Sequence, residues 1–368
     1  MSALSLDERQ ELGQAVRAAC ARLCSEERVR RVAYECGGFD AELWTVLCGQ
    51  VGVGAIGMPE DLGGAGFGAS ALAIVAHELG RTLAPVPFLA SAVLATGLLV
   101  EAGASPARLE QLAEGKRVAA AVITGDGGFS ARPGATFEAR QRSGEWRIDG
   151  KARHVLHGTA ADDLVVVAMV DGKRAIFLID TSAAGVVIEP EEVLDSTRPM
   201  ASIALCDVAA EELTANGPVD GLIDRCLRRA LAVLSAEQVG ACERILEIAT
   251  EYARTREQFG RPIGSFQAIK HRCADMLVEL EFARSASQAA VEWADGGGDD
   301  SWRVSMAKAV CSEVLRNAAH SNMQIHGGIG FTWEGSAGLY MKRARTDEVL
   351  FGLPGEHWDR VATEAKLF

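Results

Sequence analysis

The chain has 368 residues and a mass of 39.0 kDa, which allows two or three compact units around a large apolar core. Its 37 basic and 50 acidic residues give a net charge of -13, which argues against a general nucleic-acid-binding or anionic-membrane surface. The N-terminus lacks the basic, apolar and small-residue succession of a signal peptide, and no apolar run is long and charge-free enough to cross a bilayer. We therefore expect a cytoplasmic protein with no nucleic-acid or membrane partner.

The cysteines number nine, and they include neither a CxxC pair nor a Cys/His cluster at ligand spacing. An odd count of scattered cysteines in a large chain is typical of reduced thiols that are mostly buried. They are Cys20, Cys24, Cys36, Cys48, Cys206, Cys226, Cys242, Cys273 and Cys311. We expect no disulfide framework and no metal site.

The first third of the sequence, from about Ser5 to Gly115, has a helical pattern. Long segments rich in Ala, Leu, Glu and Arg are separated by Gly and Pro clusters, of which the longest runs from Pro59 to Gly68. Ser5 and Glu8 have the spacing of a capping box, in which the two side chains satisfy free backbone N–H groups at a helix start. These signals predict an N-terminal helical domain over residues 1–115.

From Val118 to about Leu213 the sequence changes to short Val/Ile-rich runs with turn signals between them. This pattern predicts a central β domain over residues 116–215, folded as a small barrel or sandwich. The segment from Asp195 to Arg198 fits a turn in this domain, with Arg198 pairing locally with Asp195. The predicted strands lie at Ala119–Thr124, Trp146–Lys151, Asp163–Ala168, Ala175–Ile179, Gly185–Ile188 and Ile203–Cys206.

After Gly217-Pro218 the helical period returns and continues to the end of the sequence. The predicted elements are a helix from about Gly221 to Glu257, a turn near Pro262, and helices that begin near Ser265 and Trp302. They predict a C-terminal helical domain over residues 216–368, so the chain is of the α+β class. The basic residues Lys342, Arg343 and Arg345 are expected on a solvated helix face, with attraction of phosphates as the alternative.

The first of two stretches that suggest a ligand runs from Arg256 to Gln267 and reads REQFGRPIGSFQ. Arg256 falls at the end of the long predicted helix, so its fork of donors can reach a pyrophosphate beyond the helix. Phe259 offers an apolar face to a ring, and Gln267 offers a donor and an acceptor early in the next helix. Alone, an Arg at a helix end is more often a solvated partner of the helix dipole.

The second stretch runs from Gln324 to Gly330 and reads QIHGGIG. Gly327 and Gly328 lack a Cβ, so a cofactor can approach their backbone closely. Gln324 lies about one helical turn earlier on the same face. A Gly-Gly pair alone is usually only a turn, and it is the combination with the first stretch that indicates a site.

Together with Met58 to Gly66 (MPEDLGGAG) and His77 to Arg81 (HELGR), these stretches resemble the acyl-CoA dehydrogenase family across essentially the whole chain. The resemblance implies a helical domain, a β domain, a C-terminal four-helix bundle, bound FAD, and α,β-desaturation of an acyl-CoA. It also implies a dimer of dimers with each FAD across a subunit interface, and an electron-transfer flavoprotein as electron acceptor. The positions implied to hold the ADP half of the neighbouring subunit's FAD are Arg256, Gln258, Phe259, Gln267, Gln324, Gly327 and Gly328.

The carboxylate that should act beside the flavin is absent from both places where the family puts it. Desaturation requires a base that removes the α-proton while flavin N5 accepts the β-hydride. In most members a Glu does this in a segment that corresponds here to Leu350–Leu353, and its position holds Phe351. A second family location falls near Arg229–Leu231 and has no acid. A surface or salt-bridge role is favoured for the nearby acids Asp224, Glu237, Asp347, Glu348 and Glu356.

The β domain departs from the family in the same direction. The segment Thr124–Ser130 replaces a Thr-Glu-Pro-x-Ala-Gly-Ser-Asp-like segment, and Ala152–His157 replaces the usual Trp-Ile-Thr that meets the flavin ring. His154 and His157 lie three apart in a predicted strand, so they point to opposite faces and do not form a metal site.

Three hypotheses follow. We favour a partner subunit of a heteromeric acyl-CoA dehydrogenase, a heterotetramer in which a homologous catalytic subunit brings the base and the flavin pocket. The alternative is a homotetrameric acyl-CoA dehydrogenase with a relocated carboxylate base. The third is a non-enzymatic scaffold that retains only the fold.

Overall fold

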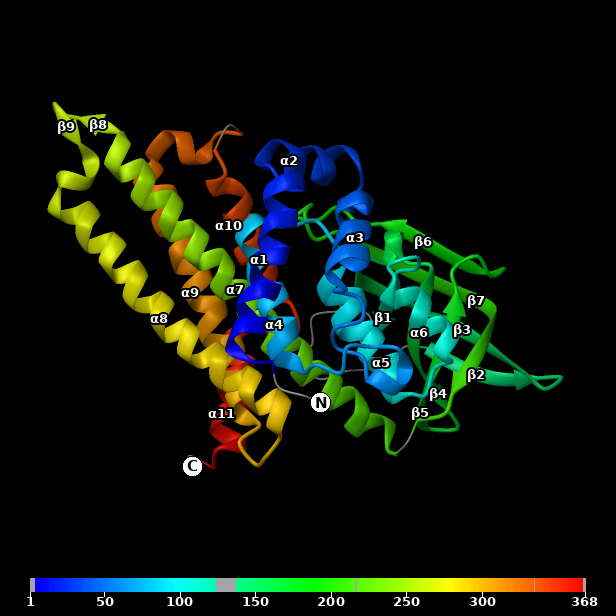
Figure 1. Cartoon of the computed structure of the whole chain (residues 1–368). Coiled ribbons are helices and arrows are strands. Elements are labelled where there is room, and N and C mark those ends of the chain that lie inside the picture. The colour runs from blue at the N-terminus through cyan, green and yellow to red at the C-terminus, as the bar shows by residue number, and fades with distance from the viewer. Residues whose placement is uncertain (1–3, 124–136, 216, 334, 367–368) are drawn as a thin grey trace.

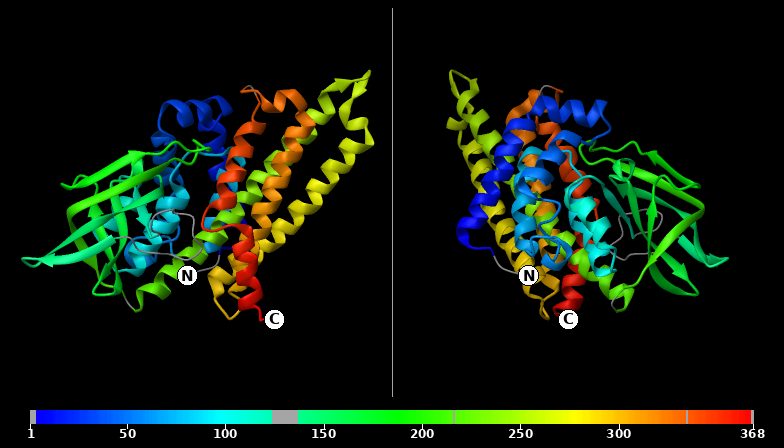
Figure 2. Two further views of the ribbon diagram at one scale, coloured as in Figure 1. Left: turned by 180° about the vertical axis from the view of Figure 1, so that it is seen from behind. Right: turned by 45° about the vertical axis from the view of Figure 1, so that its right-hand side comes forward.

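The computed structural model describes residues 4–123, 137–215, 217–333 and 335–366. The N-terminal helices lie in the middle of the molecule, between a β region on one side and a bundle of long helices on the other (Figure 1). A view from behind and a view turned by 45° show the same three-part arrangement (Figure 2). The predicted order of helices, strands and helices and the α+β class are confirmed.

The N-terminal part is helical from α1 onward. The predicted capping box is present, because Glu8 N donates to Ser5 Oγ at 3.3 Å and Ser5 N donates to Glu8 Oε2 at 2.8 Å. The elements are α1 (Leu6–Leu23), α2 (Glu26–Glu35), α3 (Ala41–Val46), the π-helical η1 (Leu47–Val51), η2 (Glu60–Leu62), α4 (Ala69–Thr82), the π-helical η3 (Phe88–Ala95), α5 (Thr96–Glu101) and α6 (Pro106–Ala113).

The β region is a barrel with two additional strands. Strands β4, β2, β3, β7 and β5 pair in that order, and β5 pairs back to β4, which closes the ring. Strand β1 pairs in parallel with β4, and β6 pairs with β7. All six predicted strands are present, and β2 was missed. The strands are β1 (Ala119–Val122), β2 (Phe137–Arg142), β3 (Glu145–Leu156), β4 (Asp163–Val170), β5 (Lys173–Asp180), β6 (Val186–Pro190) and β7 (Met200–Leu213), with the short helix η4 (Gly158–Ala160) after β3.

The C-terminal part is built on three long helices, of which α7 and α8 are joined by a two-stranded hairpin. Its apolar core contains side chains from α7, α8, α9 and α10. No described helix is long and apolar enough to span a membrane. The elements are α7 (Val219–Thr255), β8 (Glu257–Gln258), β9 (Arg261–Pro262), η5 (Ile263–Ser265), α8 (Gln267–Gly296), α9 (Trp302–His326), η6 (Gly327–Phe331), α10 (Ala337–Val349) and α11 (Pro354–Glu364).

One apolar core runs through the N-terminal helices, the inner strands of the barrel and α7. Ion pairs join the helices to the barrel, because Arg108 and Arg117 both bind the buried carboxylate of Asp163 at 2.9 and 2.8 Å. All nine cysteines are free thiols and six of them are buried, as predicted. The helical and β parts are therefore held in a fixed relation, which places the segments described next.

Candidate functional site

The β8–β9 hairpin stands at the far end of the bundle, where α7 passes into α8 (Figure 1). Its two turn residues, Phe259 and Gly260, have φ angles of 53° and 73°, so both are left-handed as in a type I′ turn. Glycine adopts this conformation freely, whereas a phenylalanine there is strained by about 1 kcal/mol or more. The Phe259 side chain is 91% exposed. Its ring contacts that of Phe266 edge-on, with centroids 6.1 Å apart, so the single chain offers this side chain only a peripheral contact.

The polar residues predicted in this stretch lie on the surface around the hairpin. Arg256 is the residue that ends α7, and its carbonyl oxygen accepts a hydrogen bond from Ile263 N at 2.8 Å. Its guanidinium has no hydrogen-bond or ion-pair partner among the described residues. Gln267 begins α8 and is exposed. Gln258 instead donates to the carbonyl oxygen of Glu257 at 2.8 Å, within the hairpin.

The second stretch begins where α9 ends. Gly327 has a φ of 61°, and a Cβ built on Gly327 or on Gly328 would meet no atom within 4 Å. The backbone here is thus open to a ligand. Gln324 is exposed one turn earlier, and its side chain has no hydrogen-bond partner among the described residues.

The two stretches meet at the same end of the bundle. The ring of Tyr252 on α7 stacks on His326 at the end of α9, with centroids 4.1 Å apart and planes 21° from parallel. Nδ1 of His326 lies 2.9 Å from the carbonyl oxygen of Asn322, which fixes the ring. Sequence reasoning missed this pair, although Tyr252 stands one helical turn before Arg256 and His326 lies inside the second motif.

The position of the expected base is buried. Phe351 has a φ of 60° and is only 5% exposed, and its side chain is part of the large apolar core. It lines a cavity of about 20 Å³ with Leu94, Ile123 and Leu156, which is room for about one water molecule. The described residues therefore leave no space at this position for a substrate or a flavin ring.

Two buried basic side chains hold the loop that carries Phe351. Nζ of Lys308 donates to the carbonyl oxygens of Asp347 and Glu348 at 2.9 and 3.2 Å, near the C-terminal end of α10. Nε2 of His357 lies 3.0 Å from the carbonyl oxygen of Phe351. Burial lowers the pKa of Lys308 to about 8 and that of His357 to about 4. Neither residue was predicted, because only the fold brings them to this loop.

A buried network of five charged side chains lies beside this loop. Arg343 binds Asp195 at 2.6 Å and Glu237 at 2.5 Å, while Arg198 contacts Glu237 and lies 3.1 Å from Asp347. The predicted turn is present, because Arg198 N donates to Asp195 O at 3.0 Å, but the Arg198 guanidinium pairs with Glu237 and Asp347 and not with the Asp195 carboxylate. The expectation of a solvated Arg343 is also wrong, because α10 packs this residue against α7 and the turn between β6 and β7. Paired charges are needed here, since an isolated buried charge is costly.

The five acids near the missing base all have partners. Asp224 binds Arg228 at 2.7 Å, Glu348 binds Arg316 and Arg345 at 2.6 Å each, and Glu356 accepts from Leu353 N at 3.1 Å as a helix cap. The predicted surface or salt-bridge role is confirmed for all five, since four are in ion pairs and Glu356 is exposed, although Glu237, Asp347 and Glu348 are buried. Burial raises the pKa of Asp347 to about 6.

The two histidines of the altered β segment have different surroundings. Nδ1 of His154 lies 2.6 Å from Glu191 Oε2. His157 is buried, and burial lowers its pKa to about 3. No group of three His, Cys, Asp or Glu side chains in the described residues could hold a metal ion. The segment Thr124–Ser130 lies outside the described residues.

The sequence matches two family descriptions, "Acyl-CoA dehydrogenase, N-terminal domain" over residues 7–114 and "Acyl-CoA dehydrogenase, C-terminal domain" over residues 222–365. It is 34% identical over 358 residues to acyl-CoA dehydrogenase IpdE2 of Mycobacterium tuberculosis, and the alignment covers 97% of each chain. The chain therefore belongs to the acyl-CoA dehydrogenase family, a family of FAD-dependent oxidoreductases.

Two solved structures are similar over nearly their whole length. The ChsE4-ChsE5 complex from Mycobacterium tuberculosis has a chain with a TM-score of 0.88 and 28% identity, covering 100% of both chains. A variant of the Tcur3481-Tcur3483 steroid ACAD has a TM-score of 0.87 and 28% identity, covering 98% of both chains. The family resemblance and the three-part fold predicted from the sequence are thus confirmed.

Proposed function

We propose that this chain is the non-catalytic subunit of a heteromeric acyl-CoA dehydrogenase. In this assembly it supplies the ADP-side half of an FAD site, and a homologous subunit supplies the flavin pocket and the base. The observation that carries the proposal is the contrast between its exposed, unpartnered cofactor-side residues and the buried phenylalanine at the base position.

The cofactor-side residues fit an FAD that approaches from another chain. Arg256 and Gln324 have side-chain donors without partners among the described residues, and the backbone at Gly327 and Gly328 is open. An Arg fork with free donors suits a pyrophosphate, and Phe259 at the tip of the hairpin can cover an aromatic ring. We assign Arg256, Gln267, Gln324, Gly327 and Gly328 to the grip on the ADP half. Gln258 contributes through its place in the hairpin, which orients Phe259.

In the proposed reaction, FAD would supply the acceptor for the hydride that leaves the β-carbon of an acyl-CoA. This chain's part is to bind and orient the cofactor and to exclude water from its ADP end. The catalytic subunit removes the α-proton, and an electron-transfer flavoprotein takes the electrons. The likeness to a steroid ACAD favours a bulky steroid-derived acyl group.

The surroundings of Phe351 support the proposal that the catalytic base comes from the other subunit. Phe351 fills the position of the carboxylate, and the neighbouring acids are engaged by arginines or by a helix start. A carboxylate that is already held in an ion pair or a helix cap is not free to reach an α-proton. An acyl-CoA dehydrogenase site within the described part of this chain alone would lack both a base and a cavity.

One observation favours a second candidate, a homomeric enzyme with a relocated base. Asp347 has a pKa raised to about 6 by burial, and groups with such shifts gather at active sites. Asp347→Asn should abolish turnover if this carboxylate is the base, with FAD retained. Glu348→Gln on the same helix is the matched control. Under the subunit proposal, both variants of the complex keep the wild-type rate.

The test compares acyl-CoA oxidation by the chain alone with oxidation by the chain co-purified with a homologue that carries the Glu. We expect turnover only in the complex. A rate for the chain alone in the usual enzymatic range, on the order of 1 to 1000 per second, would contradict the proposal.

A further inference from the structure

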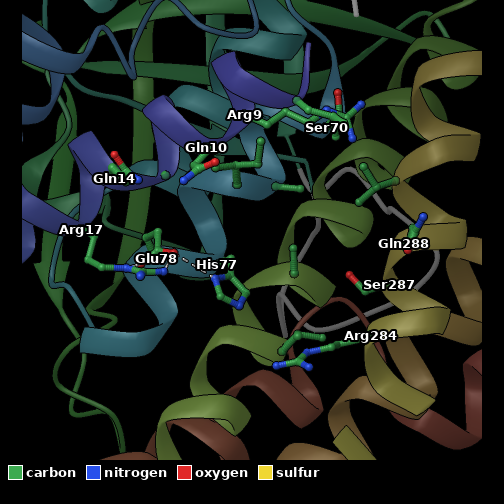
Figure 3. A pocket seen from close by; sticks show the side chains of 17 residues that line it. Arg9, Gln10, Gln14, Arg17, Ser70, His77, Glu78, Arg284, Ser287 and Gln288 are labelled. Atoms are coloured by element: carbon green, nitrogen blue, oxygen red, sulfur yellow. Dashed lines mark hydrogen bonds and ion pairs between the residues drawn. The ribbon is translucent and has the colours of Figure 1, made fainter. Parts of the chain in front are cut away.

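A cleft unrelated to the cofactor stretches opens between the N-terminal helices and the bundle. It has a volume of about 700 Å³ and is lined by α1, α4, α7 and α8 (Figure 3). Cavities of roughly 300–1,000 Å³ are typical of sites for small molecules. Residues from Arg9 to Arg17 on α1 form one wall, and Arg284 to Gln288 on α8 lie across from them.

The floor of the cleft is apolar. It consists of Ala73 and Ile74 from α4, Ala236 and Val239 from α7, and Val291 from α8. Four of these five side chains are buried by the helix packing itself, and only Ile74 is partly exposed. A ligand with an apolar body would cover this floor, and each Å² removed from water contributes about 25 cal/mol.

The polar rim of the cleft is cationic. Arg9, Arg17 and Arg284 line it, and Glu78 is the one carboxylate among its described lining residues. This excess of arginines over carboxylates among the lining residues contrasts with the chain as a whole, which has a net charge of -13. The terminal nitrogens of Arg9 have no partner among the described residues, because only its Nε donates, to Leu4 O at 3.2 Å. The rim thus keeps donors free for an anion.

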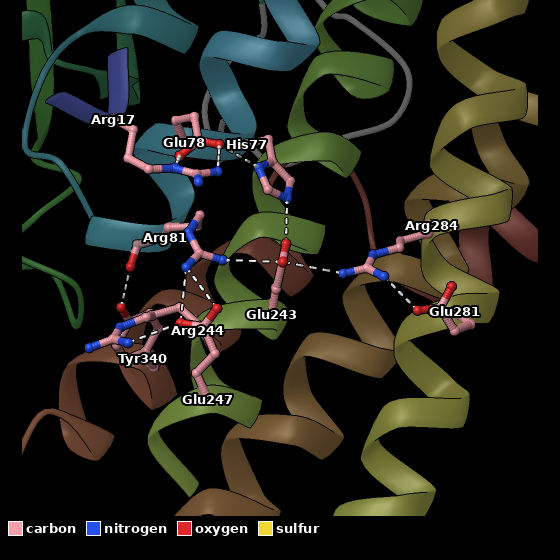
Figure 4. Close-up of polar contacts among 10 residues, drawn as sticks. All are labelled: Arg17, His77, Glu78, Arg81, Glu243, Arg244, Glu247, Glu281, Arg284 and Tyr340. Carbon is pink, nitrogen blue, oxygen red and sulfur yellow. Dashed lines mark hydrogen bonds and ion pairs between the residues drawn. The ribbon is translucent and has the colours of Figure 1, made fainter. Parts of the chain in front are cut away.

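An ion-pair network fixes the deep end of the cleft (Figure 4). Arg17 donates to both oxygens of Glu78, at 2.9 and 2.7 Å, which leaves its second terminal nitrogen free. His77 lies 2.8 Å from Glu243 and 3.4 Å from Glu78. Arg284 pairs with Glu281 and Glu243. The network therefore occupies these carboxylates and fixes Arg17 and Arg284, while Arg9 lies outside it.

We propose that this cleft binds an amphipathic carboxylic acid, with its apolar body on the Ile74–Val239–Val291 floor and its carboxylate at Arg9. Guanidinium groups recognise carboxylates through paired hydrogen bonds, which explains the use of arginine at the rim. The inference goes beyond the subunit proposal and does not depend on it, because no residue of the cofactor stretches lines the cleft.

The test uses the full-length chain, alone and in its complex, with laurate as the anionic probe and dodecyltrimethylammonium as a cation of equal chain length. Calorimetric titration should show laurate binding and at least tenfold weaker binding of the cation. Arg9→Gln should weaken laurate binding about tenfold, since a hydrogen bond to a charged group is lost. Arg142→Gln on β2 is the matched control and should have no effect.

Gly13→Leu provides a variant that does not depend on removing a charge. Gly13 lies in α1 against the cleft, 3.5 Å from Ile74 at its would-be Cβ, so a leucine there fills the space and also favours the helix. We expect loss of laurate binding with the thermal stability unchanged or raised. Wild-type laurate affinity in both Arg9→Gln and Gly13→Leu, or equal affinity for the cation, would overturn the inference. The FAD content of the complex reports on the subunit proposal separately and should be constant across these variants.

Discussion

Two phenylalanines in the left-handed backbone region mark the two halves of an expected active site, and they have opposite surroundings. Phe259 has a φ of 53° and is 91% exposed, whereas Phe351 has a φ of 60° and is 5% exposed. The strain at Phe351 is offset by packing inside the chain. Phe259 has only an edge-on contact with the ring of Phe266, so most of its side chain lies in solvent. The contrast teaches that one half of the expected site is closed and the other half is exposed, as the subunit proposal requires.

The largest effect is expected at the buried network that adjoins the closed half. Arg343→Ala leaves the carboxylates of Asp195 and Glu237 without this partner in the core, and the free energy of unfolding should fall by about 3–5 kcal/mol. Arg345→Ala on the same helix removes a half-exposed pair with Glu348 and should cost less than about 1 kcal/mol. Denaturant unfolding measures both. Equal losses would mean that the network is not what holds the closed half together.

Phe351 itself provides the next prediction. Phe351→Ala should lower the free energy of unfolding by about 3 kcal/mol through the lost packing, while FAD content of the complex is unchanged. Phe351→Gly should be about 1 kcal/mol less destabilising than Phe351→Ala, because glycine adopts a positive φ without strain. A complex of either variant that lost its FAD would show that this side is not closed.

At the exposed cofactor-side residues we expect the reverse, a loss of FAD binding without a loss of stability. Arg256→Ala is expected to weaken FAD binding in the complex by about 1.5–3 kcal/mol, a roughly tenfold to hundredfold rise in Kd, because a charge-assisted hydrogen bond is removed. The free energy of unfolding of the single chain should be unchanged, since the guanidinium has no partner among the described residues. Fluorescence titration with FAD measures the first quantity. If the affinity matched that of the Arg142→Ala control, Arg256 would not be a cofactor ligand.

Substitution of Phe259 at the hairpin tip should change stability and subunit assembly in opposite directions. Phe259→Asn creates the Asn-Gly turn that type I′ geometry prefers, so the single chain should gain about 1 kcal/mol of stability. The same change should weaken assembly with the catalytic subunit, which would lose an apolar contact. Unfolding of the isolated chain and a titration of the two subunits separate these effects. A gain in stability without any loss of assembly would assign Phe259 no role in the interface.

The smallest expected effect is a pH dependence of stability that comes from His77, which lies outside both halves of the expected site. Burial lowers the pKa of His77, but its contacts with Glu243 and Glu78 outweigh burial and the net shift is upward. A raised pKa means stabilisation that is complete below the unfolded value of about 6.5 and is lost as pH rises through the folded value. His77→Gln should remove this pH dependence of the free energy of unfolding, worth less than about 1 kcal/mol between about pH 6 and pH 9. An unchanged pH dependence in the variant would show that His77 is not its source.

The sequence predicted much of the fold because its local signals agree with the final structure. The capping box at Ser5 and six of the strands follow from residue pattern alone. Strand β2 was missed because its segment, FEARQR, is mostly polar and lacks β-branched residues. Arg256, Phe259 and Gly327 could be found because each stands at the end of a helix or in a turn that the sequence also marks.

The parts that could not be predicted depend on contacts between distant segments. Arg343 and Asp195 are 148 positions apart, so only the packing of α10 against the turn after β6 makes them partners. Lys308 binds backbone oxygens 39 and 40 positions away and therefore leaves no pattern in the sequence. The cleft between α1 and α8 could not be predicted either, since its walls come from segments that are far apart in the chain.

The measurement that tests the central claim most directly is the ratio of FAD to protein, for this chain purified alone and co-purified with a homologue that carries the catalytic Glu. The account predicts almost no FAD on the chain alone and one FAD for each pair of chains in the complex. One FAD per chain in the protein purified alone would contradict it.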